Sequence, residues 1–373
     1  MMAFFPPPTE TYYARCEQLS QITYKNKEIV KEEIPSLSRF IITQPVCSYY
    51  KKGVFGTPKT VMCNQETQEM YVLLKEKISD IGTFKKVTSA VFLPPLASKQ
   101  SACLVAQWVS RDNLVPSDYE LCCRDAKLHK LFSGCPGIWP LHFCVKYVKQ
   151  KTNKEKVTAF APLATGSLDT IKIPDWKALI DVAFQLIQGV HSLHQKGYIH
   201  GDIKSPNVLF KVTNAPEKKF VVGFNDFGFS FEVGKEKPSF VFQEGYYGSV
   251  DCTPPELFGN CRFAGDYFKT DIWALGVLLA WLRGKPLDWK TFIANCYKLG
   301  NGIYEEEITF VRAKINRLIE VNFLLLEQRQ PLVDPLEQLD FLIYKMLRLD
   351  PARRPDAGAL LQEITRIRSS IIS

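Results

Sequence analysis

The sequence contains no long run of apolar residues, and none approaches the roughly 18 that a membrane-spanning helix needs. It also begins without a secretory signal, because residues 1–10, MMAFFPPPTE, are too few and too broken by proline to form an apolar signal core. We therefore expect no membrane span and a reducing compartment, which is the cytoplasm, the nucleus or the cytosol of a host cell.

The cysteines do not form a disulfide or metal-binding framework. Eleven are present, yet Cys122, Cys123, Cys135 and Cys144 lack the paired CxxC spacing of a zinc site. We expect reduced and mostly buried thiols.

Charge of one sign is not concentrated anywhere. The net charge is +8, and basic runs such as residues 149–151 stand close to acidic residues without forming an arginine-rich block. This pattern is typical of a solvated surface, so we expect no nucleic-acid partner. A mild positive charge still favours the approach of a polyanionic ligand.

The residue types that are present indicate two lobes. Residues 1–40 have no firm period and form an N-terminal extension in our interpretation. From there to about residue 160, short alternating runs predict strands, interrupted by one helix at about 116–133. The rest of the chain favours helices. The expected strands are FIIT, KTVMC, EMYVLLK, ACLVAQWV, HFCVKYV and KVTAFAPL, and the expected later helices lie near 174–197, 271–283, 289–300, 305–328, 336–348 and 356–370.

The most specific motif is HGDIKSPN (200–207), which is followed by DFG (226–228). It places Lys204 two residues and Asn207 five residues after Asp202, and DFG adds Asp226 beside a glycine. This set resembles the catalytic residues of eukaryotic-type protein kinases. The resemblance extends over roughly residues 45–368. It implies an α+β, two-lobed protein-kinase fold, with a β-rich lobe at 41–160, an insert in that lobe at about 78–115, and a helical lobe at 161–373.

The resemblance also implies a role for each residue of the motif. Asp202 would accept the proton of the substrate hydroxyl, and Lys204 would neutralise the transferring phosphate. Asn207 and Asp226 would hold Mg²⁺ against the phosphates of ATP. Phosphoryl transfer depends mostly on positioning and charge neutralisation, and these residue types supply both.

KKGVFGTP (51–58) resembles the glycine-rich loop that covers the phosphates in this family. Gly53 and Gly56 would let the backbone approach the nucleotide, and Phe55 would lie at the tip of the loop. The chain departs from the family pattern here, with Lys51 at the position of the first glycine and Pro58 where a valine is usual.

Lys75, at the end of the apolar run VLLK, resembles the family lysine that holds the α- and β-phosphates. In the family this lysine pairs with an acid on the following helix. Asp125 aligns best with that acid, and Glu120 is the alternative.

The adenine pocket is expected at the lobe junction, VTAFAPLATGSL. By resemblance, Thr158 guards the back of this pocket, and the backbones of Phe160 and Ala161 contact the adenine.

Gly201 stands where the family usually has an arginine that binds a phosphate on the activation loop. Its presence predicts that phosphorylation of that loop is not the main switch. HGD also resembles the aminoglycoside and choline kinases. The downstream sequence argues for a protein kinase instead, because Glu256 and Arg354 match a buried ion pair of that family and Asp271 matches the residue that braces its catalytic loop.

The resemblance therefore predicts a serine/threonine protein kinase that uses ATP and Mg²⁺ on protein substrates, since Lys204 followed by Ser-Pro-Asn is typical of that class. Two alternatives stay open. One is a pseudokinase or nucleotide-binding scaffold, and the other is a kinase of small molecules.

Overall fold

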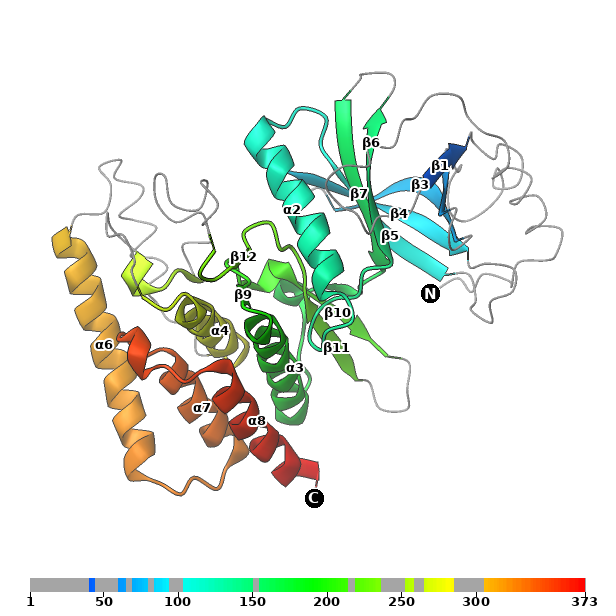
Figure 1. Cartoon of the computed structure of the whole chain (residues 1–373). Coiled ribbons are helices and arrows are strands. Elements are labelled where there is room, and N and C mark those ends of the chain that lie inside the picture. The colour runs from blue at the N-terminus through cyan, green and yellow to red at the C-terminus, as the bar shows by residue number, and fades with distance from the viewer. Residues whose placement is uncertain are drawn as a thin grey trace. The chain divides into compact units, whose positions relative to one another are not determined.

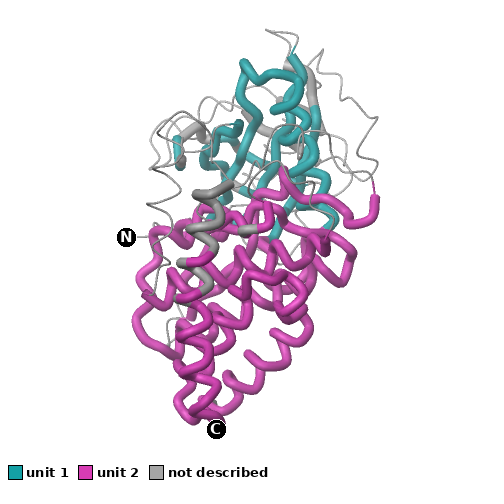
Figure 2. The backbone as a smooth tube through the Cα atoms, turned by 90° about the vertical axis from the view of Figure 1, so that its left-hand side faces the viewer, with its two compact units in different colours: residues 1–131, 140–163 teal, residues 132–139, 164–373 magenta. Residues whose placement is uncertain are grey.

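The computed structural model describes residues 40–43, 60–64, 69–79, 84–93, 103–149, 154–213, 219–235, 252–257, 265–284 and 305–372. The chain divides into two compact units, coloured separately in Figure 2. The first comprises residues 1–131 and 140–163, and the second comprises residues 132–139 and 164–373. The expected lobe boundary at 160/161 lies just before the observed one, but the transfer of 132–139 to the second unit was not foreseen.

The first unit is an antiparallel sheet of seven strands in the order β1-β2-β3-β4-β5-β7-β6 (Figure 1). Its strands are β1 (Phe40–Thr43), β2 (Thr60–Asn64), β3 (Met70–Ser79), β4 (Lys85–Leu93), β5 (Cys103–Ser110), β6 (Phe143–Lys149) and β7 (Lys154–Pro162). Each of the six runs expected to be strands overlaps one of these.

The stretch at about 78–115, expected to be an insert, supplies two middle strands of this sheet, β4 and β5. We did not predict β4 as a strand. Its buried positions include Thr88 and Ser89, so the apolar alternation that marks a half-buried strand is weak. Burial is possible because Thr88 donates to Gln107 Oε1, and Gln107 Nε2 donates to Thr158 Oγ1 at 3.0 Å.

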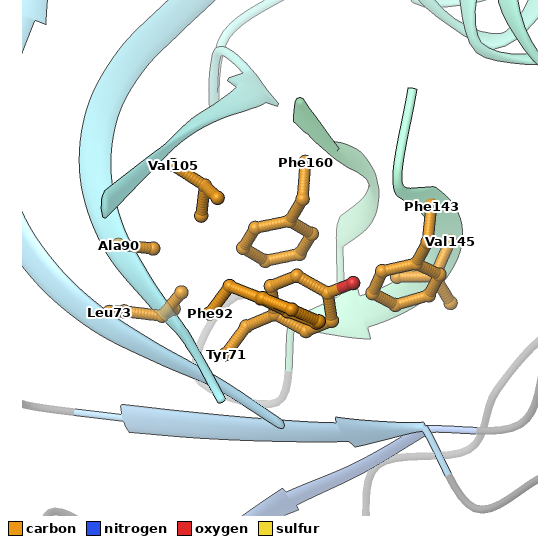
Figure 3. Close-up of a cluster of buried hydrophobic side chains, with 8 residues drawn as sticks. All are labelled: Tyr71, Leu73, Ala90, Phe92, Val105, Phe143, Val145 and Phe160. Atoms are coloured by element: carbon orange, nitrogen blue, oxygen red, sulfur yellow. The ribbon is translucent and has the colours of Figure 1, made fainter. Parts of the chain in front are cut away.

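The two faces of the sheet bury different clusters, as the alternation of side chains along a strand requires. One face carries an aromatic cluster, in which the Tyr71 ring centroid lies 4.3 Å from that of Phe160 and 5.1 Å from that of Phe143 (Figure 3). The other face packs against helix α2 (Pro116–Phe132), which matches the helix expected at 116–133.

Two thiols lie between α2 and the sheet. Cys122 on the helix and Cys144 on β6 belong to the same buried cluster as Trp108 and Ala126. Cys144 Sγ donates to the backbone oxygen of Ala126 at 3.5 Å, and burial raises the pKa of this thiol to about 12. The helix therefore covers a Cys144 thiol that stays protonated at neutral pH.

The second unit is mostly helical (Figure 1). Its longer helices are α3 (Trp176–Gln195), α4 (Phe268–Leu282), α6 (Glu305–Gln328), α7 (Pro335–Met346) and α8 (Ala357–Ile372). All five were expected, and the helix expected at 289–300 lies outside the described residues. Asp175 caps α3 by accepting from the backbone N–H of Ala178, and Gly197 follows the helix at φ +81°. None of the described helices is long and apolar enough to cross a membrane.

Short strands and turns connect these helices. β8 (Gly166–Ser167), β10 (Val208–Val212) and β11 (Phe220–Phe224) form one small sheet, and β9 (Tyr198–Ile199) pairs with β12 (Phe231–Glu232). Single 3₁₀ turns are η1 (Leu168–Thr170), η2 (Ser205–Asn207), η5 (Pro255–Leu257) and η6 (Pro351–Arg353).

Residues 132–139 belong to the second unit because their backbone bonds to β11. Phe224 N–H donates to the oxygen of Gly137, and Trp139 N–H donates to the oxygen of Phe224, both at 2.9 Å. Gly137 also abuts Gly189 of α3, and a β-carbon on Gly137 would lie 2.4 Å from the Gly189 Cα. Only glycine allows this approach.

The expected ion pair between Glu256 and Arg354 is confirmed. The guanidinium forms two parallel bonds to the carboxylate, at 2.6 and 2.8 Å, although the residues are 98 positions apart. Its other N–H groups donate to the backbone oxygens of Arg348, Lys269 and Leu349. The Arg354 side chain is fully buried, so the fold satisfies all five donors internally.

Replacing Arg354 by alanine should lower the free energy of unfolding by about 3–5 kcal/mol, because the Glu256 carboxylate and three backbone oxygens lose their donors. Urea denaturation followed by circular dichroism measures the change. The matched control is Arg353→Ala, which removes the adjacent, exposed arginine. Equal midpoints for the two variants would contradict the structural role assigned to the pair.

Candidate active site

The β10–β11 hairpin brings together the two residues expected to bind a metal. Val208, the first residue of β10, pairs with Phe224, the last residue of β11. Asn207 directly precedes β10 and Asp226 lies two residues after β11, so both stand at the same end of the ribbon. A bond from Asn225 N–H to the oxygen of Asn207, 2.9 Å long, holds the two segments together there.

The Asp202 carboxylate is held by the other residues of its own motif. Its Oδ2 accepts a 2.7 Å hydrogen bond from Asn207 Nδ2 and lies 2.8 Å from Lys204 Nζ. Asn207 Nδ2 also donates to the backbone oxygen of Asp202 at 2.9 Å. Asp202 and Asn207 are buried, whereas Lys204 is partly exposed. The spacing of two and five residues thus builds one compact acid–amide–ammonium cluster.

Asp271 braces this loop, as the sequence predicted. Its carboxylate accepts the backbone N–H groups of His200 at 2.7 Å and Gly201 at 3.0 Å. The Nε2 atom of His194, on α3, lies 3.1 Å from the same carboxylate. Asp271 is itself buried on α4, so the brace connects the loop to two helices of the second unit.

The ring of His200 links the catalytic loop to the DFG segment. Its Nε2 is 3.3 Å from the oxygen of Asn225, and its Nδ1 accepts the N–H of Asp202. These partners assign the proton to Nε2, because a carbonyl requires a donor and an N–H requires an acceptor. The ring also packs on Phe227, which packs in turn on Phe132 at the end of α2.

Asp226 is the one non-glycine residue with positive φ in the described part of the chain, at 68°. This conformation costs a residue with a β-carbon about 1–2 kcal/mol. The next residue, Phe227, is fully buried, and backbone strain of this kind is concentrated at functional sites.

The residues at the end of the ribbon fit a hard cation such as Mg²⁺. Magnesium prefers oxygen ligands and binds through one or two carboxylates together with phosphates. Asp226 brings a carboxylate. The amide nitrogen of Asn207 donates twice to Asp202, which fixes the orientation of the amide and turns its oxygen away from that acid.

Gly201 has a positive φ of 78°, and a β-carbon there would lie 2.6 Å from the backbone oxygen of Phe229. The position that carries arginine elsewhere in the family is therefore crowded in this chain. A larger residue requires the Phe229 segment to move.

In the first unit, the structure pairs the α2 acid Asp125 with Lys85 of β4. Lys85 Nζ lies 2.7 Å from Asp125 Oδ2, and the carboxylate is almost fully buried. The expected partner was Lys75 on β3, whose side chain lies outside the described residues. β3 is not the strand before the helix, since β4 and β5 follow it. The alternative acid, Glu120, is exposed. Burial lowers the pKa of the Arg124 guanidinium, and the charge of Glu120 opposes part of that shift.

The three residues expected at the adenine pocket all lie on β7 and are buried. Thr158 and Phe160 project to the face with the aromatic cluster, and Thr158 Oγ1 donates to the oxygen of Trp108 at 2.7 Å. Ala159 projects to the face that carries α2, and so does Ala161 by alternation. The roles of Thr158, Phe160 and Ala161 in nucleotide binding stay predictions.

Sequence reasoning missed Lys85 and Trp108. The signal for them was the order of strands before the helix, which no local pattern revealed. The loop residues Gly53, Phe55 and Gly56 lie outside the described residues.

Comparison with known proteins assigns the family. A model described as the protein kinase domain matches residues 141–364, more than half of the chain. The chain therefore belongs to the protein kinase family, and its α+β architecture is the two-lobed fold of that family. The match begins after Asp125, so it does not bear on the choice of lysine.

Several serine/threonine kinases are similar to parts of the chain. A serine/threonine-protein kinase-like protein of Arabidopsis thaliana is 33% identical over 114 residues, which are 30% of this chain and 29% of that protein. The calcium and calcium/calmodulin-dependent serine/threonine-protein kinase of Pisum sativum is 28% identical over 183 residues, 49% of this chain and 29% of that protein. A putative serine/threonine-protein kinase of Acanthamoeba polyphaga mimivirus is 24% identical over 196 residues, 52% of this chain and 58% of that protein. The chain thus spans less than two thirds of each of these relatives.

Gly201→Ala should destabilise the protein more than Gly234→Ala. Both glycines have positive φ, which costs about 1–2 kcal/mol for alanine. Of the two, Gly201 faces a backbone oxygen, whereas a β-carbon on Gly234 meets no atom of the described residues within 4 Å. The overlap should add about 1–3 kcal/mol. Melting temperatures of the two variants measure the difference. Equal melting temperatures would show that the backbone around Gly201 and Phe229 moves apart without a loss of stability.

Proposed function

We propose that this chain is an active serine/threonine protein kinase, which transfers the γ-phosphate of Mg-ATP to hydroxyl groups of protein substrates. The observation that supports this most strongly is the buried Asp202 carboxylate, held at 2.7 Å by Asn207 and at 2.8 Å by Lys204. A carboxylate fixed in this way is suited to take the proton of an alcohol.

In the proposed reaction, the substrate hydroxyl gives its proton to Asp202 as its oxygen bonds to the γ-phosphorus. The bond between that phosphorus and the β–γ bridging oxygen breaks, and ADP leaves with the electron pair. Lys204 neutralises charge on the transferring phosphoryl group. Asn207 and Asp226 would hold Mg²⁺, which supplies further charge neutralisation to the phosphates.

The bracing of the loop supports catalysis rather than simple binding. Transfer depends on holding the acceptor and the phosphate in line, and a rigid carboxylate meets that requirement. Asp271 fixes the backbone on the N-terminal side of Asp202 through two N–H bonds. The Glu256–Arg354 pair supports a protein substrate, because by resemblance this pair belongs to the protein kinases and not to the small-molecule kinases.

Asp202→Ala should lower the rate of phosphate transfer by about 10²- to 10⁴-fold, the usual contribution of a general base. Asp226→Ala should abolish phosphate transfer. In the unmodified protein, chelation of magnesium should also abolish it. The assay uses γ-labelled ATP, with the protein itself, a generic basic protein and a cell extract as acceptors. Phosphoamino acid analysis should place the label on serine or threonine.

Glu327→Gln, which neutralises an exposed acid on α6, is the matched control and should transfer at the unmodified rate. Full activity of Asp202→Ala would overturn the mechanism. An unmodified protein that transfers nothing, yet melts at a higher temperature with ATP, would indicate a nucleotide-binding scaffold. Label on a free amino alcohol, and not on protein, would indicate a small-molecule kinase.

A further inference from the structure

We propose that Lys85, on β4, is the lysine that binds the α- and β-phosphates of the nucleotide, and that Asp125 holds it in position. This inference rests on the proposed function and names a further residue for it. In protein kinases the phosphate-binding lysine is defined by its ion pair with an acid of the helix that follows the strands. In the described part of this chain, that ion pair joins Lys85 and Asp125.

The Lys85–Asp125 ion pair is buried in the first unit and is not a surface contact. The Asp125 side chain is 1% exposed and that of Lys85 is 14% exposed, with 2.7 Å between Nζ and Oδ2. A carboxylate this deeply buried strongly favours a cation beside it. The lysine is therefore fixed by the acid, while its partial exposure leaves it accessible to a ligand.

The strand that precedes α2 has no lysine of its own. β5 reads CLVAQWVS, and its residue Trp108 faces α2 within the buried cluster there. The Lys85 ammonium lies 5.0 Å from the centroid of the Trp108 ring, a cation–π distance. The Trp108 ring on β5 therefore packs against the Lys85 ammonium, and the lysine itself lies on the neighbouring strand β4.

The position of Lys85 in its strand also suits a phosphate ligand. It is the first residue of β4 and pairs with Ser110, the last residue of β5. Lys85 therefore lies where β4 begins, beside the end of β5 that leads into α2. Lys75 lies on β3, which β4 separates from β5 in the sheet.

The test compares lysine variants of the full chain by phosphate transfer and by nucleotide binding. Lys85→Met should lower kcat/KM for ATP by about 10²- to 10³-fold, the usual loss of a charge-stabilising donor. Lys86→Met is the matched control, because it removes the exposed neighbouring lysine, and it should keep the unmodified rate. Full activity of Lys85→Met, or a loss with Lys75→Met alone, would overturn the inference.

A double variant separates phosphate binding from stability. Lys85→Met leaves a buried carboxylate without this partner and should lower the melting temperature, whereas Lys85→Met combined with Asp125→Asn should recover part of that loss. The inference requires that phosphate transfer stays lost in the double variant. Recovery of transfer together with stability would show that the lysine is only structural.

Nucleotide binding keeps the test decisive if no transfer is seen. ADP should raise the melting temperature of the unmodified protein more than adenosine does, and Lys85→Met should remove that difference. An unmodified protein that binds ADP but transfers nothing contradicts the proposed function alone. A Lys85→Met variant that still distinguishes ADP from adenosine contradicts this inference. An unmodified protein that does not distinguish ADP from adenosine contradicts both this inference and the proposed function.

Discussion

The geometry of the catalytic loop depends on one buried carboxylate, that of Asp271. Two backbone N–H groups of the loop and the imidazole of His194 converge on it, so a single acid on α4 fixes where the loop starts. From that point the chain reaches Asp202 in a defined orientation, and Asn207 closes the loop by bonding back to it. Such a network is sensitive to the loss of any member, because each buried polar group relies on the others for its hydrogen bonds.

The second unit was largely predictable because its signals are local. HGDIKSPN compresses the acid, the ammonium and the amide into eight residues, and their spacing alone brings them together once a 3₁₀ turn forms. The helices carry apolar stripes with caps such as Asp175, which identify both their type and their bounds. Even the Glu256–Arg354 ion pair, whose residues are far apart in the sequence, could be predicted, because both residues occur in recognisable motifs.

The first unit was less predictable because its site depends on which strands are neighbours. Lys85 and Asp125 are 40 positions apart, and no periodicity connects them. The strand β4 was not recognised because its buried positions include the polar residues Thr88 and Ser89, and Thr88 is buried with a hydrogen bond to Gln107 of β5. With that strand unrecognised, the family lysine was expected at Lys75 on β3, whose side chain lies outside the described residues. Cross-strand pairing is a non-local property that a single sequence carries only weakly.

The thiols under α2 give this lobe a built-in chemical reporter. Cys122 and Cys144 are enclosed between the helix and the sheet, and a pKa of about 12 at Cys144 leaves almost no thiolate at neutral pH. Alkylation at these sulfurs must therefore wait for the helix to lift. The labelling rate at Cys122 and Cys144 themselves would measure how often Asp125 leaves its place beside Lys85, which makes the docking of the helix an observable equilibrium.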